Sequence, residues 1–204
     1  TSDLGSGSGA GASATSDLGS GSGAGASATW DLGSGSGAGV SASSDMGSEP
    51  GPGAGSCSGM FTANTMSNLA EALGMALPFN GTAPAVYAER IWLAKQTGYK
   101  AVELVNANIK PKDIMTRDAF YNAIAADMAL GGSTNTALHI PAIAYYADVD
   151  INLKNFGELT EKIPHLTTIA PAGPHHVIDL FYAGGVPAIL SELHRFKLIN
   201  THAM

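Results

Sequence analysis

The sequence predicts an α/β fold that is mostly helical and is preceded by a low-complexity tail. Three observations support this prediction. Residues 1–51 repeat a unit of 14 residues that is rich in glycine, serine and alanine. Residues 52–204 contain apolar stripes at helical spacing, separated by glycine and proline. One short β-branched segment among them indicates a strand, and helices that alternate with strands are typical of a layered α/β domain.

The tail repeats at a fixed period. Residues 1–14 and 15–28 are identical, and residues 29–42 differ from them at two positions. Each unit offers a single Leu or Met for packing, which cannot offset a backbone entropy of roughly 1–2 kcal/mol per ordered residue. We therefore expect residues 1–51 to be disordered. The alternative is silk-like pairing of the small side chains, which would make the chain a structural or fusion protein with a functional repeat.

Composition and charge argue against several classes of protein. The chain has 10 Lys and Arg against 17 Asp and Glu, and five of the acidic residues lie in the tail, so the remainder is nearly neutral. We expect no nucleic-acid binding, which basic patches support. We expect no membrane association, because no apolar run approaches the roughly 18–20 residues of a span. No targeting signal is visible in the sequence. We expect a cytoplasmic protein if the source is a prokaryote and an organellar one if it is a eukaryote.

Apolar spacing predicts three helices in the first half of the globular part. The first helix begins just after Cys57 and runs to about Leu77, and the second follows Pro84. After a break at residues 110–113, Thr116 caps a third helix. The stripe of the second helix is expected to face the core, and it consists of Ile91, Ala94, Gly98, Val102, Val105 and Ile109.

The second half alternates further helices with one strand. The segment "LGGSTNT" separates the third helix from a fourth, in which Pro141 predicts a kink or restart. A short helix near residues 155–162 precedes a β-branched strand over Leu166–Pro171. Two more helices are expected around Val177–Tyr182 and Pro187–Phe196. The adjacent pair His175 and His176 is expected to cap a helix or to lie at the surface.

Cys57 is the single cysteine of the chain and lies in a glycine-rich turn at a helix start. Unpaired N–H groups and the helix dipole favour the thiolate there. Such a thiolate can be a metal or cluster ligand, a nucleophile or a bystander. The stretch "GSCSG" matches the cysteine form of the hydrolase elbow, but that elbow requires a buried strand before it. The preceding "EPGPGA" cannot be a central strand.

Five segments resemble the dihydroxy-acid/6-phosphogluconate dehydratase family, and in detail its dihydroxy-acid branch. They occur in the family order and together cover essentially residues 52–200. The segments are "GSCSGMFTANTMSNLAEALGMALPFNGT", "PAVYAERI", "IKPKDIMTRDAF", "DMALGGSTNTALHIPAIA" and "PAGPHHVIDLFYAGGVPAILSEL".

The resemblance implies part of a three-layer α/β/α domain from a hydro-lyase. The family converts 2,3-dihydroxy-3-methyl acids into 2-oxo acids in valine and isoleucine synthesis, with an iron-sulfur cluster (2Fe-2S or 4Fe-4S) and Mg²⁺, and forms homo-oligomers. Cys57 matches the last of three cluster cysteines. Ser133, Thr134 and Asn135 are expected to line the substrate site, although a simple helix-capping role explains these residue types equally well.

The chain departs from the family pattern in its ligand set. The repeat stands where the family has its two earlier cluster cysteines and Mg²⁺ ligands, and the domain with the serine base is absent from the sequence. We therefore predict that these residues alone lack dehydratase activity and that a monomer holds no stable cluster. The expected division is a tail over residues 1–51 and a partial dehydratase domain over residues 52–204.

Overall fold

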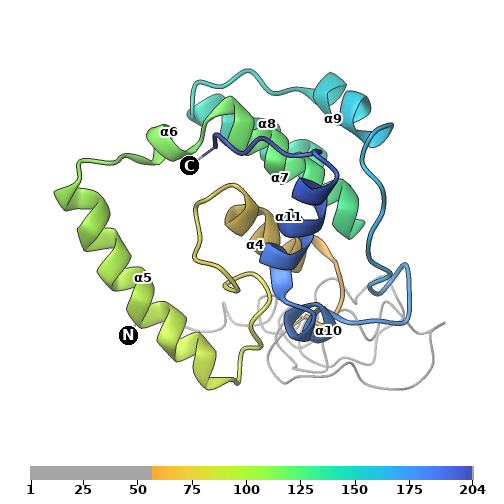
Figure 1. Ribbon diagram of the computed structural model, residues 1–204, viewed down its shortest axis with the longest axis horizontal. Coiled ribbons are helices and arrows are strands. Elements are labelled where there is room, and N and C mark those ends of the chain that lie inside the picture. The colour runs from red at the N-terminus through yellow and green to blue at the C-terminus, as the bar shows by residue number, and fades with distance from the viewer. Residues whose placement is uncertain (1–56, 204) are drawn as a thin grey trace, which may run out of the picture.

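The computed structural model describes residues 57–203 (Figure 1). The predictions made for the repeat, both its disorder and the silk-like alternative, fall outside these residues. Eight helices lie within the described range. They are α4 (Thr62–Ala72), α5 (Ala88–Asn106), α6 (Pro111–Ile114), α7 (Arg117–Leu130), α8 (Thr136–Tyr146), α9 (Leu153–Thr160), α10 (Val177–Tyr182) and α11 (Gly185–Arg195).

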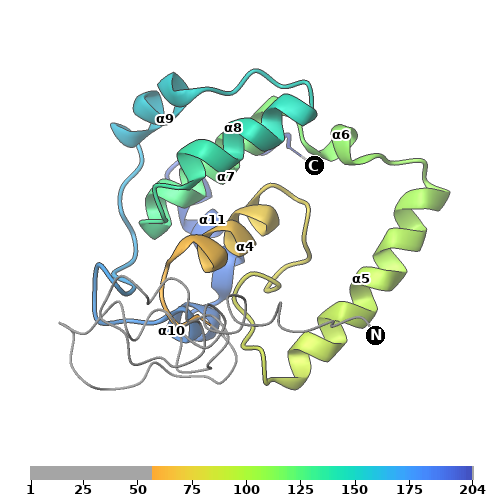
Figure 2. The same cartoon turned by 180° about the vertical axis from the view of Figure 1, so that it is seen from behind.

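The core forms around α7, which packs against α4, α8, α9 and α11. Its side chains are buried along nearly the whole helix, including Phe120 and Ile124. The predicted cap is confirmed, because the Thr116 hydroxyl accepts a hydrogen bond from the Ala119 N–H at 3.3 Å. Gly131 ends the helix with a φ of 66°, a left-handed conformation that glycine adopts without strain. Figure 2 shows α7 and α8 beside α4 and α11.

The first predicted helix ends earlier than expected. It stops at Ala72 rather than Leu77, and Gly74 follows with a φ of 84°. The buried carboxylate of Glu71 then accepts hydrogen bonds from the Phe79 N–H at 2.7 Å and the Gly81 N–H at 2.9 Å. These bonds hold the turn beyond the helix, so the chain leaves α4 before its apolar spacing ends.

The second predicted helix exists, but its apolar stripe is not in the core. None of the residues of α5 is buried. In both views α5 stands apart from the other helices (Figures 1 and 2). Apolar spacing therefore identified a helix and its apolar face correctly, but placed that face in the wrong environment. The predicted break at residues 110–113 instead contains the short helix α6.

The predicted strand over Leu166–Pro171 did not form. The described residues contain one isolated parallel bridge, between Ile169 and His175, and no sheet. The segment bonds to loops and helix ends instead: the Leu166 N–H donates to the Ala129 carbonyl at 2.8 Å. The layered α/β arrangement is therefore not seen in residues 57–203, which are helical. None of the described helices is long and apolar enough to cross a membrane.

Candidate functional site

Cys57 lies in a loop that crosses the N-terminal end of α4. The side-chain amide of Asn64, in the first turn, donates to the Cys57 carbonyl at 2.6 Å and to the Gly59 carbonyl at 2.7 Å. The half-buried Cys57 Sγ lies 3.6 Å from the same Gly59 carbonyl oxygen. No acidic residue occupies the first turn of α4, so no side-chain charge there offsets the positive end of the helix dipole. Cys57 lies four residues before Phe61, the N-cap residue of α4, so the helix begins later than the sequence predicted.

A second segment supports this loop from the other side. The Met60 N–H donates to the Ala170 carbonyl at 2.7 Å, and the Val177 N–H at the start of α10 donates to the Ser58 carbonyl at 2.8 Å. Gly59 is packed so closely that an added Cβ would lie 2.8 Å from the Ala170 oxygen and 2.6 Å from the Phe61 ring. Glycine is therefore the residue that this approach allows.

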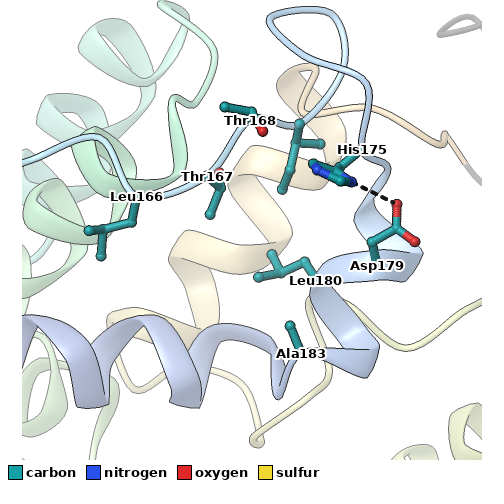
Figure 3. Close-up of a pocket in the computed structure, with 8 residues that line it drawn as sticks. Leu166, Thr167, Thr168, His175, Asp179, Leu180 and Ala183 are labelled. Atoms are coloured by element: carbon teal, nitrogen blue, oxygen red, sulfur yellow. Dashed lines mark ion pairs between the residues drawn. The ribbon is translucent and has the colours of Figure 1, made fainter.

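A cavity of about 360 Å³ lies between residues 166–169 and α10, next to the segments that hold the Cys57 loop (Figure 3). His175 and Asp179 lie at its edge, with the His175 Nδ1 and the Asp179 Oδ2 3.9 Å apart. Asp179 also accepts a hydrogen bond from the His176 N–H at 2.7 Å and so caps α10. The predicted surface role is confirmed for His175, which is exposed, whereas the hydrogen bond that caps α10 is accepted by Asp179 and not made by a histidine side chain.

The "GGSTNT" loop meets the same end of α4. The Ser133 Oγ lies 3.1 Å from the Thr62 Oγ1, and the Asn135 amide donates to that hydroxyl at 2.6 Å. The Ser133 N–H donates to the Thr65 hydroxyl at 3.1 Å. Cys57, Ser133 and Asn135 are thus all held by residues of the first turn of α4, although more than 70 positions separate the cysteine from the other two.

The hydrogen bonds of Ser133 and Asn135 show whether their side chains act as caps of α8. Asn135 is the N-cap residue of α8, yet its side chain makes no capping hydrogen bond there and binds Thr62 of α4 instead. Ser133 does contribute locally, because its hydroxyl lies 3.3 Å from the Asn135 N–H that donates to it. Thr134 is exposed. The structure therefore joins Asn135 and Ser133 to α4 and leaves Thr134 at the surface of the loop.

Asp127, which the sequence analysis did not single out, lies buried beneath this loop. The Thr136 hydroxyl donates to its Oδ2 at 2.6 Å, while its Oδ1 is buried and has no hydrogen-bond partner in the described part of the chain. Burial raises the pKa of Asp127 from 3.8 to about 6, and the hydrogen bond from Thr136 partly opposes the shift. The available sequence signal was an acid at an inward position of α7, four residues before a glycine pair.

The Asp127 carboxyl and the loop share one hydroxyl. The Thr136 Oγ1 lies 2.6 Å from the Asp127 Oδ2 and 2.8 Å from the Ser133 carbonyl oxygen. A hydroxyl carries a single hydrogen, so both contacts are hydrogen bonds at once only when the carboxyl is protonated and donates to Thr136. Protonation of Asp127 therefore completes a chain of hydrogen bonds from α7 to the loop.

The described residues do not by themselves fit an iron-sulfur cluster or Mg²⁺. Iron-sulfur clusters are normally held by several thiolates, and the chain has Cys57 alone. Within residues 57–203, no group of three or more His, Cys, Asp or Glu side chains is placed to hold a metal ion. The arrangement instead offers a helix N-terminus, hydroxyls and an amide, which are groups that bind anionic oxygen atoms.

Comparisons with known proteins identify the same family that the sequence motifs resemble. The family model described as "Dihydroxy-acid/6-phosphogluconate dehydratase N-terminal" matches residues 36–204. Proteins named dihydroxy-acid dehydratase from Halothermothrix orenii, Acetivibrio thermocellus and Pyrococcus abyssi are each 60% identical over 145 residues, which is 71% of this chain and 26% of each relative. The chain thus spans about a quarter of the length of these curated relatives.

Proposed function

Because this chain belongs to the dihydroxy-acid/6-phosphogluconate dehydratase family, we propose that it is part of a dihydroxy-acid dehydratase. This enzyme is a hydro-lyase that converts 2,3-dihydroxy-3-methyl acids into 2-oxo acids in valine and isoleucine synthesis. The observation that carries the proposal is the meeting of the Cys57 loop and the Ser133–Asn135 segment at one helix end. Identity of 60% to proteins named for this activity supports it.

We propose Cys57 as a ligand of an iron-sulfur cluster, either 2Fe-2S or 4Fe-4S. The N-terminus of α4 favours a thiolate and an anionic group beside it. One thiolate is not enough, so the other cluster ligands, and the ligands of Mg²⁺, would come from regions that the relatives have outside the matched segment. In a complete site these metals would supply Lewis-acid chemistry.

We propose that Ser133, Thr134 and Asn135 contact the small-molecule substrate. A 2,3-dihydroxy acid presents a carboxylate and two hydroxyls, which suit hydroxyl and amide side chains beside a helix N-terminus. The hydrogen bonds of Ser133 and Asn135 to Thr62 keep these side chains at that end of α4. Asp127 is a positioning residue in this proposal, because it acts through Thr136 on the loop.

We also propose that the helices of residues 57–203 are one portion of a three-layer α/β/α domain that begins near residue 52, and that the repeat is a separate tail. The long exposed apolar face of α5 supports this proposal, because further parts of such a domain would cover it. The bacterial and archaeal relatives support a cytoplasmic location. The comparisons lend no support to a silk-like structural protein or to a hydrolase with Cys57 as nucleophile.

A chimera tests the proposal. Residues 57–203 replace the corresponding segment of the Halothermothrix orenii relative, and formation of 2-oxo acid from 2,3-dihydroxy-3-methylbutanoate is followed as a hydrazone. We expect the chimera to be active and its Cys57→Ser variant to be inactive. A folded chimera without activity would contradict the proposed function. Full activity in the Cys57→Ser variant would contradict the ligand role of Cys57.

A further inference from the structure

Two hydroxyl groups face each other at the candidate site, one from the first turn of α4 and one from the loop before α8. The Thr62 Oγ1 and the Ser133 Oγ lie 3.1 Å apart, and either oxygen can donate the hydrogen bond between them. Both side chains are half-buried. What this hydroxyl pair can bind depends on how its hydrogen atoms are used.

Asn135 donates to both members of the hydroxyl pair. Its side-chain amide donates to the Thr62 Oγ1 at 2.6 Å, and its backbone N–H donates to the Ser133 Oγ at 3.3 Å. These are the other hydrogen bonds that the two hydroxyl oxygens make among residues 57–203. Each hydroxyl therefore accepts from Asn135, and neither gives its own hydrogen to Asn135.

A count of hydrogen atoms shows that the hydroxyl pair keeps one donor. Each hydroxyl carries a single hydrogen, so the pair has two. The contact between the two oxygens uses one of them, whichever oxygen donates. If Thr62 donates to Ser133, the remaining hydrogen is on Ser133, and in the reverse arrangement it is on Thr62. The pair thus offers one hydrogen to an outside acceptor in both arrangements.

The surroundings of the hydroxyl pair favour an acceptor with negative charge. The first turn of α4 contains no acidic side chain that would repel an anion. The acid that the structure connects to this loop is Asp127, and it lies buried beneath the loop, where it binds the Thr136 hydroxyl. A hydrogen bond to an ionised oxygen is roughly twice as strong as one between neutral groups. A carboxylate therefore suits the remaining hydrogen better than a neutral hydroxyl does.

We propose that the Thr62–Ser133 hydroxyl pair donates its remaining hydrogen to a carboxylate oxygen of the substrate, which makes Thr62 a further substrate-contacting residue. Either hydroxyl can be the donor, because the hydrogen bond between the two oxygens can reverse its direction. This inference rests on the proposed function, since it takes a dihydroxy acid as the ligand. It adds the substrate group that is bound and a residue of α4 that binds it.

The hydrogen count predicts how substitutions of the two residues combine. In Thr62→Val the Ser133 hydroxyl still has its own hydrogen to give, and in Ser133→Ala the Thr62 hydroxyl has one. Each single variant therefore keeps one donor, as the parent does, and only the double variant has none. If the two hydroxyls served packing alone, their losses would not be expected to show this dependence on each other.

Binding of 2,3-dihydroxy-3-methylbutanoate to the 204-residue chain, followed by the amide signals in NMR, tests this count. We expect the parent and both single variants to have Kd values within about 3-fold of each other. The double variant Thr62→Val/Ser133→Ala should bind about 10-fold more weakly or worse, because it loses a charge-assisted hydrogen bond. Similar Kd values for parent and double variant, or no binding by the parent, overturn the inference.

Three controls separate loss of the donor from loss of structure. Thr62→Ser/Ser133→Ala keeps one hydroxyl and should bind like the single variants. Ser67→Ala removes an exposed hydroxyl of α4 outside the pair and should bind like the parent. The ligand 3-methylbutane-1,2,3-triol, which lacks the carboxylate, should not distinguish parent from double variant. Equal weakening by both double variants, with unchanged circular dichroism, would overturn the inference as well.

The active chimera described above extends the test to turnover. We expect Thr62→Val/Ser133→Ala to raise its KM about 10-fold with little change in kcat, because the carboxylate is bound in the ground state and the transition state alike. If the double variant keeps the KM of the parent chimera, this inference fails and the proposed function stands. If the chimera itself is inactive, the proposed function fails, and the binding measurements on the 204-residue chain still decide the inference.

Discussion

The side-chain amide of Asn64 donates to the Cys57 carbonyl at 2.6 Å, and the same amide donates to the Gly59 carbonyl at 2.7 Å. One side chain in the first turn of α4 thus fixes the backbone on both sides of Ser58. The position of the thiol relative to the helix end therefore depends on a residue seven positions further along the chain.

We predict that Asn64→Ala loosens the Cys57 loop. The substitution leaves two carbonyl oxygens without their donor, which should lower the free energy of unfolding by about 1–3 kcal/mol. The Cys57 thiol should also react faster with iodoacetamide. Chemical denaturation and labelling rates measure these effects. Asn106→Ala, at the exposed end of α5, is the control and should change neither. An unchanged labelling rate in Asn64→Ala would show that Asn64 does not position the loop.

Gly132 should not tolerate a side chain. A Cβ there would lie 2.1 Å from the Asp127 Oδ1 and 2.7 Å from the Thr65 Cγ2, so Gly132→Ala should lower the unfolding free energy by about 2–4 kcal/mol. Gly157→Ala in α9 is the matched control. Its Cβ would meet nothing within 4 Å, and we expect it to stabilise the chain by up to about 1 kcal/mol. Thermal unfolding of both variants measures this difference as a difference in midpoint temperature. Equal midpoints would refute the predicted packing of the loop.

The buried Asp127 should make stability depend on pH. Its pKa is raised from 3.8 to about 6, so between these values the folded state binds the proton more tightly than the unfolded state. The contribution of this group is therefore most favourable below about pH 4. It falls as the pH rises towards 6 and is constant above that, with a total change on the order of 2–3 kcal/mol.

The variant Asp127→Asn should remove this dependence. An amide cannot ionise, and its NH₂ group can donate to the Thr136 hydroxyl as the protonated acid does. Stability curves measured from pH 4 to 8 should show the variant gaining on the parent as the pH rises to about 6. The control is Asp118→Asn in the first turn of α7, which is exposed. If the difference between Asp127→Asn and parent were the same at every pH, the carboxyl would not titrate as described.

The 204-residue chain on its own should have no dehydratase activity. It supplies one thiolate and lacks the remaining donors of a metal site within the described residues. Purified chain, incubated anaerobically with iron, sulfide and Mg²⁺, should give no 2-oxo acid from 2,3-dihydroxy-3-methylbutanoate. It should also show no stoichiometric iron-sulfur absorption as a monomer. Substrate-dependent product, abolished by Cys57→Ser, would contradict this prediction.

Local signals predicted some elements well. The third predicted helix corresponds to α7 because its start depends on the Thr116 hydroxyl and its end on a left-handed Gly131, both of which act within a few residues. The strand prediction at Leu166–Pro171 was wrong, because β-branched composition does not determine whether a neighbouring strand exists. The hydrogen bonds of that segment go to Ala129 and Met60, which come from distant parts of the chain.

The candidate site also contains residues that the sequence could identify and one that it could not. Cys57 could be recognised from its motif and its place at a helix start. Asp127 could not, because an acid in a helix is ordinarily exposed, and its burial arises from the loop that folds over it. The capping and site interpretations of Ser133 and Asn135 were equally compatible with the sequence. In the structure both side chains contact Thr62 of α4, and their role in lining a substrate site stays a prediction.

The sequence by itself determined the family, the positions of most helices and the residue types at the candidate site, because motifs, caps and breakers act through neighbouring residues. The tertiary structure decided which faces are buried and which distant segments meet. It exposed the apolar stripe of α5, buried Asp127 and brought residues 133–135 to the first turn of α4. Burial and hydrogen-bond partners across the fold depend on contacts between residues far apart in the chain, which the spacing of residue types along a helix does not specify.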